Sequence, residues 1–308
     1  MKILVTGGAG FIGSHVVDFL VERGDDVVVV DNLSTGKKEN LNPKALFYKL
    51  DINSEVLEEI FKGSIEIVIH LAAQVSVSKS QENPAQDAFV NINGSLNLIN
   101  FTKKYGVEKF IYINSAAIFG DPHYLPIDEH HPRNPKANYG ISKKVVEDYL
   151  KLSKINYVSL RLANVYGPRQ IAEAEGGVVA IFSKAVINGE TVFIHGDGEQ
   201  TRDFIFVTDA AKAIICAMDS GRGCFNIGTG RKTTINELIK IIKSICPSEI
   251  HEQEAPVRGG DIHDSFFEVG KAREFLEWEA ETSLKDGLKE TIDYERNKTK
   301  NIRSNLRL

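Results

Sequence analysis

Short apolar runs rich in β-branched residues alternate with longer segments of helical period along the first half of the chain. These runs lie at positions 3–5, 27–30, 65–69, 110–113 and 158–160. Between most of them, apolar residues recur every three or four positions, as they do on one face of a helix. Runs that are apolar at every position are typical of strands covered by helices on both faces. The pattern therefore predicts an α/β fold with a doubly wound parallel sheet.

The regular alternation ends near the middle of the chain. Positions 176–198 contain a helix-like stretch and a Gly-rich loop, and two capping-box patterns further on predict two helices. One pattern pairs Thr234 with Glu237, and the other pairs Ser283 with Asp286. We therefore expect a smaller, mostly C-terminal α/β domain beside the sheet.

The composition is that of a globular protein. The chain has 308 residues, of which 42% are apolar and 26% charged, and this excludes disorder for most of it. The net charge of -5 argues against a nucleic-acid partner, and no apolar stretch is long enough to span a membrane. The three cysteines have no CxxC spacing, so we expect neither a disulfide framework nor a metal site. Glycines interrupt the apolar run at the N-terminus, so we expect a cytoplasmic protein without a signal peptide.

Basic side chains are concentrated in the last residues. Positions 296–308 contain five Lys and Arg residues and no acid, which leaves 32 basic and 42 acidic side chains in the rest of the chain. We interpret this tail as a frayed, solvated terminus in preference to an arm that binds membrane or nucleic acid.

A glycine-rich turn follows the first predicted strand directly. In TGGAGFIG, Gly8, Gly10 and Gly13 have GxGxxG spacing, and Gly7 adds a second pattern with GxxGxxG spacing. The turn opens a helix predicted at positions 11–21, whose N-terminal N–H groups and dipole can hold a pyrophosphate. Glycines allow the backbone to turn tightly and the phosphates to approach it.

The second predicted strand ends in an acidic residue. Asp31 lies 18 residues after Gly13, where a carboxylate accepts hydrogen bonds from the hydroxyls of an adenosine ribose and repels a 2′-phosphate. Strand, turn, helix and acid together predict a Rossmann-type dinucleotide site that prefers NAD. NADP stays open as an alternative because Lys37 and Lys38 follow closely.

Two Tyr–Lys pairs have YxxxK spacing. Tyr105 and Lys109 lie where a predicted helix passes into a strand, so they need not face one another, and we interpret them as a chance pair. Tyr139 and Lys143 begin a helical stretch, so both project from one face. A cation there stabilises phenolate over phenol, which a tyrosine needs if it is to act as a general base and later as an acid.

Ser115 follows the strand predicted at 110–113, at the carboxyl edge of the sheet where ligands bind in open α/β folds. Its hydroxyl could hydrogen-bond a substrate oxygen opposite Tyr139 and Lys143. The alternative is a serine at the end of a strand that satisfies its own backbone.

Several short motifs occur together in this chain. They are TGGAGFIG, Asp31, Asp51 with Ile52, HLAA at 70–73, NINGS at 91–95, NSAAIFG at 114–120, YGISK at 139–143 and NVYGPR at 164–169. Together they resemble the extended short-chain dehydrogenase/reductase family and, within it, the nucleotide-sugar epimerases of the UDP-glucose 4-epimerase type. The resemblance runs to about residue 294. It implies an NAD-binding Rossmann domain at 1–163 and 203–228, a nucleotide-sugar-binding domain at 164–202 and 229–295, and a basic tail at 296–308.

The resemblance also assigns residues to the cofactor. NAD would be lined by Gly7, Gly10, Phe11, Ile12, Gly13, Asp31, Asn32, Leu33, Ser34, Thr35, Gly36, Asp51, Ile52, Leu71, Ala72, Ala73, Gln74, Val75, Tyr139 and Lys143, with Asn91 supporting the site. Several family members have a lysine after HLAA where this chain has QVSV, so one phosphate contact is unaccounted for. The helices around 84–104 and 139–152 would pair in a homodimer.

The same resemblance implies a catalytic group of Ser115, Tyr139 and Lys143 and a site for a UDP-sugar. The substrate residues would be Ser115, Asn164, Gly177, Val178, Arg202, Arg258, Asp261 and Ser265. The two arginines suit a diphosphate. Ser265 falls near a position that is bulky in epimerases limited to plain hexoses and small in those that accept N-acetyl sugars, so we expect N-acetyl forms to be tolerated.

The implied reaction interconverts UDP-glucose and UDP-galactose by C4 epimerisation, through a 4-keto intermediate with transient hydride transfer to bound NAD. Related dehydratases and decarboxylases have acids directly after the catalytic Ser or Thr, whereas this chain has Ala116 and Ala117, which favours simple epimerisation. Two alternatives stay open: a net NAD-dependent dehydrogenase or reductase of the same superfamily, and a non-catalytic NAD-binding sensor. The complete set of Ser115, Tyr139 and Lys143 counts against the sensor.

Overall fold

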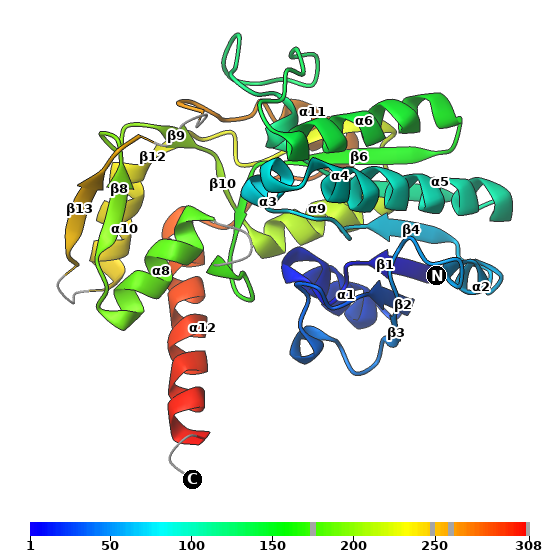
Figure 1. Cartoon of the computed structure of the whole chain (residues 1–308), viewed down its shortest axis with the longest axis horizontal. Helices are drawn as coiled ribbons and strands as arrows, with labels where there is room; N and C mark the ends of the chain where they lie inside the picture. The colour runs from blue at the N-terminus through cyan, green and yellow to red at the C-terminus, as the bar shows by residue number, and fades with distance from the viewer. Residues whose placement is uncertain (173–176, 247–249, 258–261, 306–308) are drawn as a thin grey trace.

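The computed structural model describes residues 1–172, 177–246, 250–257 and 262–305. It contains a seven-stranded sheet with helices on both faces and, beside it, a smaller group of helices and short strands (Figure 1). The seven strands are parallel and lie in the order β11-β6-β5-β4-β1-β2-β3. The doubly wound parallel fold predicted from the sequence is therefore confirmed.

The strands of the large sheet form where the sequence has its apolar runs. They are β1 (Lys2–Thr6), β2 (Asp26–Asp31), β3 (Leu46–Lys49), β4 (Ile67–His70), β5 (Lys109–Ser115), β6 (Tyr157–Leu162) and β11 (Gly223–Ile227). Each of the five predicted runs overlaps one of them. The edge strand β3 is mostly exposed and was not predicted, although its Leu46, Phe47 and Tyr48 form a short apolar run.

Two sets of helices cover the two faces of this sheet. One face is covered by α1 (Phe11–Arg23), α9 (Val207–Asp219) and α11 (Gly270–Leu276), and the other by α2 (Leu57–Phe61), α5 (Gly94–Tyr105) and α6 (Asn138–Ser153). In β1, Ile3 and Val5 belong to the first core and Leu4 to the second. The strands are apolar at every position because both of their faces are buried.

Three short helical elements lead from β4 to α5 along the carboxyl side of the sheet. They are α3 (Val77–Glu82), α4 (Pro84–Ala88) and a π-helical turn, η2 (Phe89–Asn93). Two further short turns, η1 (Lys38–Asn40) and η3 (Ala116–Ile118), follow β2 and β5. α3, α4 and η2 all pack against α6.

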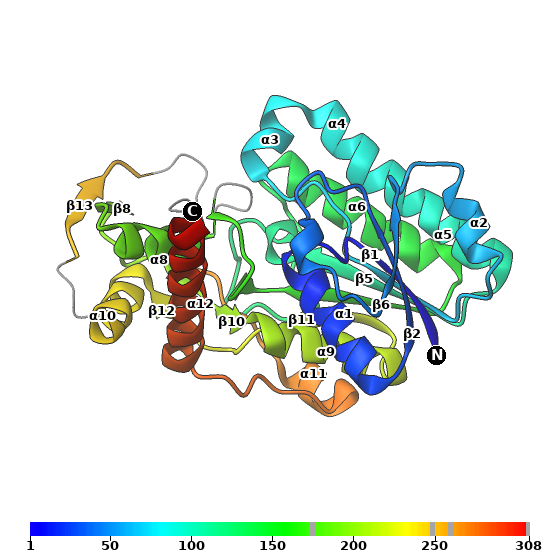
Figure 2. The same ribbon diagram turned by 90° about the horizontal axis from the view of Figure 1, so that it is seen from below.

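The smaller group of elements lies beyond the carboxyl ends of the parallel strands (Figures 1 and 2). It contains β7 (Asn164–Tyr166), α8 (Val178–Asn188), β8 (Val192–His195), β9 (Thr201–Arg202), β10 (Phe204–Phe206), β12 (Thr233–Thr234), α10 (Ile235–Ile245), β13 (Glu252–Ala255) and α12 (Leu284–Asn305). The strands pair as β7 with β10, β8 with β13 and β9 with β12. Tyr166, Phe182, Leu238 and Leu288 belong to a separate core in this group.

Both helices predicted from capping boxes are present. Thr234 and Glu237 form a complete capping box at the start of α10. Ser283 accepts a hydrogen bond from the backbone N–H of Asp286 at 3.2 Å, immediately before α12. These local patterns predicted the helix starts correctly because they satisfy backbone donors that the helix itself cannot.

The basic segment is helical as far as Asn305, so the expectation of a frayed terminus is wrong for residues 296–305. Leu288 and Ile292 are buried on α12, and Arg296 donates a hydrogen bond to the Sγ of Cys246 at 3.0 Å. Apolar contacts hold the first turns of the helix, and the Lys and Arg residues that follow are good helix formers.

The three cysteines are free thiols, with Cys224 and Cys246 buried and Cys216 half-buried. Within the described ranges, no group of His, Cys, Asp and Glu side chains could hold a metal ion. The helices in those ranges are all too short or too polar to cross a membrane.

Candidate active site

The glycine turn joins β1 to α1 at the carboxyl edge of the sheet. Gly7 has a φ of 75°, which residues with a side chain rarely adopt. A Cβ at Gly13 would overlap the carbonyl oxygen of Gly7. In the described structure, α1 begins after Gly10 with no side-chain cap and no acid in its first turn. The positive end of its dipole therefore faces the open side of the turn without a competing carboxylate.

Asp31 lies at the end of β2, beside this turn, and is 7% exposed. Its two oxygens accept hydrogen bonds from the backbone N–H groups of Ala9 at 3.0 Å and Leu33 at 2.8 Å. Burial raises the pKa of the carboxyl group, and the two backbone donors oppose that rise. A Cβ at Gly36 would lie 2.9 Å from both oxygens, so the chain passes close over the acid. Asp31 is thus held in one orientation, where the ribose hydroxyls are expected.

This end of the site fits a dinucleotide. The turn allows phosphates to approach the backbone, α1 offers N–H groups, and Asp31 offers fixed acceptors. Asn32 donates a hydrogen bond to Asp51 at 2.8 Å, which joins the ends of β2 and β3 where the adenine is expected. The arrangement therefore supplies the donors, the acceptors and the open backbone that NAD requires.

Lys143 lies one turn after Tyr139 on α6 and is 4% exposed. Its Nζ donates a hydrogen bond to the carbonyl of Ile113 at 2.8 Å. The same Nζ lies 4.8 Å from the centre of the Tyr112 ring and 6.0 Å from that of the Tyr139 ring. Burial lowers the pKa of Lys143 to about 7. An ammonium so close to Tyr139 favours the phenolate form of that side chain.

Ser115 ends β5 and caps the turn that follows. Its Oγ accepts a hydrogen bond from the N–H of Ala117 at 3.2 Å, and its own N–H donates to Oδ1 of Asn114 at 2.9 Å. The serine therefore does serve the local backbone, as the alternative interpretation predicts. A hydroxyl that accepts in this way still carries a hydrogen that it can donate to a substrate oxygen.

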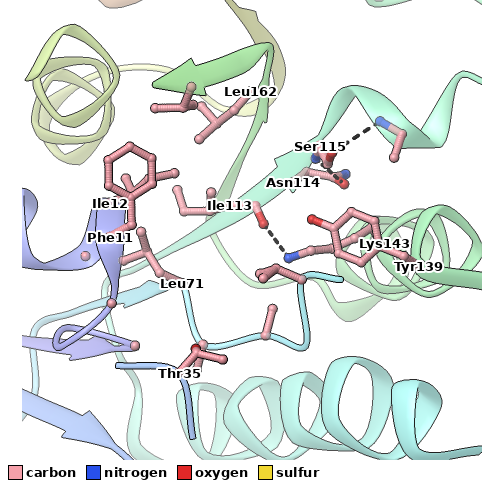
Figure 3. Close-up of a pocket in the computed structure, with 18 of the residues that line it drawn as sticks. Phe11, Ile12, Thr35, Leu71, Ile113, Asn114, Ser115, Tyr139, Lys143 and Leu162 are labelled. Carbon is pink, nitrogen blue, oxygen red and sulfur yellow. Dashed lines mark hydrogen bonds between the residues drawn. The ribbon is translucent and has the colours of Figure 1, made fainter. Parts of the chain in front are cut away.

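The catalytic candidates surround one space (Figure 3). Ser115, Tyr139 and Lys143 lie on one side of it, and Phe11 and Leu71 lie across from them. The predicted pair on α6 and the serine at the end of β5 are thus brought together by the packing of α6 on the sheet.

A single cavity of about 530 Å³ connects the glycine turn with this space, a volume typical of small-molecule sites. It is lined by most of the residues that the sequence analysis proposed. These are Gly7, Gly10, Phe11, Ile12, Gly13, Asp31, Asn32, Ser34, Thr35, Asp51, Ile52, Leu71, Ala72, Ala73, Val75, Ser115, Tyr139, Lys143, Asn164, Gly177, Arg202 and Ser265. The cofactor and substrate residues therefore share one cavity.

Some proposed residues do not line the cavity. They are Leu33, Gly36, Gln74, Asn91 and Val178, and two others, Arg258 and Asp261, lie outside the described residues. Asn91 accepts a hydrogen bond from the backbone N–H of Gln74 at 2.8 Å and donates one to its carbonyl at 3.0 Å. Asn91 therefore supports the segment after β4 from behind.

Residues from the smaller group of elements close the cavity at its far end. Arg202 of β9 donates hydrogen bonds to the carbonyls of Thr201 at 2.8 Å and His263 at 3.2 Å, which orient its side chain. The backbone N–H of Ser265 donates to the carbonyl of Thr201 at 3.2 Å. The side chain of Arg202 and the backbone of Ser265 thus both contact Thr201.

The sequence analysis missed further lining residues. They include Val30, Leu50, Val77, Val90, Ile113, Asn114, Lys136, Ala137, Leu162, Ala163, Val165, Gln170 and Ile262. Many of them are chain neighbours of a proposed residue. The alternating direction of side chains along a strand could therefore have identified them. Lys136 and Gln170 lie in loops without periodicity, where a single sequence carries little signal for contact with a distant site.

A dinucleotide site that shares one cavity with a Ser, Tyr and Lys group defines the protein as an α/β enzyme that uses a bound nicotinamide cofactor. Residues 3–228 match the NAD dependent epimerase/dehydratase family. The chain belongs to this family, and the resemblance seen in its motifs is confirmed.

Individual proteins resemble the chain over nearly its whole length. A putative UDP-glucose 4-epimerase of Methanocaldococcus jannaschii is 44% identical over 301 residues, which cover 96% of this chain and 98% of that protein. A UDP-glucose 4-epimerase of Thermotoga maritima, solved with UDP-glucose, has 48% identity and a TM-score of 0.95, and the match covers 97% of this chain and 100% of that one. A UDP-N-acetylglucosamine 4-epimerase of Methanobrevibacter ruminantium, solved with UDP-N-acetylmuramic acid, has 36% identity and a TM-score of 0.93, with 96% and 98% covered.

The glycine turn can be tested by adding one methyl group. In Gly13→Ala the new Cβ overlaps the carbonyl of Gly7, so the turn must open, and we expect NAD affinity to fall by roughly tenfold or more in a calorimetric titration. The matched control is Gly24→Asn at the other end of α1, where a side chain meets nothing within 4 Å and asparagine tolerates the positive φ. Equal NAD affinity in Gly13→Ala and the native protein would refute the assignment.

Proposed function

We propose that this protein interconverts UDP-hexoses by inverting C4 of the sugar, with NAD as a tightly held cofactor. The observation that carries the proposal is the single cavity in which the glycine turn and Asp31 meet Ser115, Tyr139 and Lys143. Support comes from the similar proteins, which are named as epimerases of UDP-sugars.

In the proposed mechanism, Tyr139 as phenolate takes the proton of the C4 hydroxyl, and the Ser115 hydroxyl bonds the same oxygen. Lys143 stabilises the phenolate from behind. NAD, held by the glycine turn and Asp31, would supply the acceptor for the C4 hydride and the donor that returns it. The 4-keto sugar turns over in the cavity, and Tyr139 then gives its proton back to the C4 oxygen. Because proton and hydride are both returned, no second substrate is consumed.

The residues that follow Ser115 support simple epimerisation. Ala116 and Ala117 line the cavity and bring no carboxyl group or base to the sugar. A dehydration or decarboxylation would need a group at this place to move another proton or hold a carboxylate. A net dehydrogenase is the second candidate, because the same three catalytic residues would serve it.

The smaller group of elements is proposed to hold the UDP moiety. Arg202, Asn164 and Gly177 line the cavity, and Val178 begins α8 beside them. We keep Arg258 and Asp261 as further substrate residues. The proposed division assigns 1–163 and 203–228 to NAD, and 164–202 and 229–295 to the nucleotide sugar.

The protein is further proposed to be a cytoplasmic homodimer. Ile141, Tyr149 and Leu152 are exposed apolar residues that share one face of α6, and Phe89 is exposed on η2, which packs against α6. Apolar side chains gathered on adjoining helices favour an interface with a second copy. The three free thiols suit a reducing compartment.

The base can be tested with Tyr139→Phe. Loss of the hydroxyl should lower epimerase turnover of UDP-galactose by about 10²- to 10⁴-fold, measured by chromatography of the products. Tyr105→Phe is the control, since Tyr105 belongs to the other YxxxK pair and donates to Glu58 at the surface. Substantial turnover by Tyr139→Phe would disprove the assignment. Accumulation of reduced cofactor in the native enzyme would favour the dehydrogenase.

The room beside Ser265 can be tested with two substrates. We expect the native protein to turn over both UDP-galactose and UDP-N-acetylgalactosamine, because a serine leaves space for the N-acetyl group. Ser265→Tyr should lose the second activity and keep the first, in matched assays. A native enzyme that acts on UDP-galactose alone would contradict this prediction.

The oligomeric state can be tested by light scattering after gel filtration. We expect the native protein to have twice the mass of the chain and Ile141→Glu to have the mass of one chain, because a charge on this face disfavours apolar contact. Phe275→Glu on α11 is the matched control, a similarly exposed position on the opposite side of the sheet. A native protein with the mass of one chain would contradict the dimer.

A further inference from the structure

Asp87 is a carboxylate with 1% exposure on α4, one turn before Asn91. Its Oδ1 accepts hydrogen bonds from Nδ2 of Asn91 at 3.0 Å and from Nε2 of Gln74 at 2.9 Å. Among the described residues, both side-chain donors to this oxygen are neutral amides. A buried carboxylate bound by neutral groups is costly unless a cation lies nearby.

The cation near Asp87 is the ammonium of Lys143. Asn91, which binds Asp87, also donates to Oγ of Ser142 at 3.3 Å, and Ser142 immediately precedes Lys143 on α6. α4 packs directly against α6. The charge of Asp87 raises the pKa of Lys143, in opposition to the larger lowering that burial causes.

The other ionisable groups that face Lys143 contribute little negative charge. On α6 itself, Glu147 is fully buried, and its carboxylate is bound by Arg161 through two hydrogen bonds of 3.0 and 2.7 Å. On β5, burial holds the pKa of Tyr112 well above its usual value, so this side chain is neutral. On β4, burial lowers the pKa of His70 to about 3, so it is neutral as well. Tyr139 is the remaining group, and it is the base that Lys143 serves.

Hydrogen bonds also keep His70 neutral. Ser95 donates to the carbonyl of Asn91 at 2.5 Å, so the contact of 2.9 Å between Nε2 of His70 and Oγ of Ser95 is donated by the ring. Nδ1 then accepts from Oγ1 of Thr6 at 2.8 Å. A neutral ring is satisfied on both nitrogens, which leaves Asp87 as the anion that acts on Lys143.

We infer that Asp87 is a positioning residue of the active site, whose buried charge holds Lys143 as an ammonium while its Oδ1 fixes Gln74 and Asn91. The inference rests on the proposed roles of Tyr139 and Lys143. The Asp87 carboxylate thereby has two roles. It orders the segment after β4, and it keeps Lys143 charged beside Tyr139.

The effect on pH dependence has a definite sign. Activity requires Tyr139 as phenolate and Lys143 as ammonium, so it rises with pH as the tyrosine loses its proton and falls as the lysine does. The charge of Asp87 makes Lys143 hold its proton to higher pH. Removing that charge should therefore move the alkaline limb of the profile of kcat/KM, which Lys143 sets, to lower pH by about one unit.

The test compares Asp87→Asn with the native protein in the pH profile of UDP-galactose turnover. The asparagine keeps an oxygen acceptor and removes the charge. We expect the alkaline limb to shift down, and we expect Asp87→Glu to keep it at its native position. Asp148→Asn is the control, since Asp148 is a half-exposed acid on the same helix as Lys143, ion-paired with Arg133. A lower kcat with an unmoved alkaline limb would overturn the proposal and leave Asp87 a purely structural role.

A second readout does not require turnover. Tyrosinate absorbs in the ultraviolet, so the difference in pH titration between proteins with and without Tyr139→Phe, in the presence of NAD, reports the ionisation of Tyr139. Its midpoint should rise in Asp87→Asn, because Lys143 then loses its proton at lower pH and no longer stabilises the phenolate. An unchanged midpoint would overturn the inference even in a protein that epimerises no sugar. Failure of the inference about Asp87 can therefore be told apart from failure of the proposed epimerase function.

Folding of the variants is checked by circular dichroism. If Asp87→Asn does not fold, Asp87→Glu and Asp87→Gln provide the comparison, since these two side chains differ in charge and hardly in size. The midpoint of the tyrosine should then be higher in Asp87→Gln than in Asp87→Glu. Equal midpoints would overturn the proposal.

Discussion

Lys143 is a lysine with almost no exposed surface, whose Nζ lies at the carboxyl end of β5. A buried cation is stable only where the surrounding groups compensate for lost water. The carbonyl of Ile113, the ring of Tyr112 and the charge of Asp87 all contribute here. Because β5 and α4 supply these groups and α6 carries the lysine, the geometry around Lys143 depends on how the helices pack on the sheet. Burial of this one charge thus links the core of the fold to the chemistry proposed for Tyr139.

A second buried acid links the two parts of the chain. Asp203 is 1% exposed and lies between Arg202 and β10. It accepts hydrogen bonds from the N–H and hydroxyl of Thr229 and from the N–H groups of Gly230 and Phe267. Burial raises the pKa of Asp203, and these donors oppose the rise. The contacts join segments from before and after β11, so Arg202 and the loop that carries Ser265 keep their places at the mouth of the cavity.

Much of the fold and many of the residues that line the cavity could be predicted from local patterns in the sequence. The runs 27–30 and 110–113 are apolar throughout because each strand has two buried faces. The short run at β3 was not predicted as a strand, and only the structure shows that it lies, mostly exposed, at the edge of the sheet. Asp87 was not predicted as a site residue, for a different reason. In the sequence it looks like a solvated residue of a short helix, and only its contacts with Gln74 and Asn91 show that it is buried.

The sequence by itself determined what depends on neighbours along the chain: the glycine turn, the acid at the end of β2, the common face of Tyr139 and Lys143, and the helix starts at Thr234 and Ser283. Backbone geometry and helical spacing act over a few residues, so one sequence is enough to reveal them. Only the tertiary structure decided which polar groups are buried, which loops line the cavity, and that the basic segment continues α12. Those outcomes depend on contacts between residues far apart in the chain, and such contacts leave no periodic trace in a single sequence.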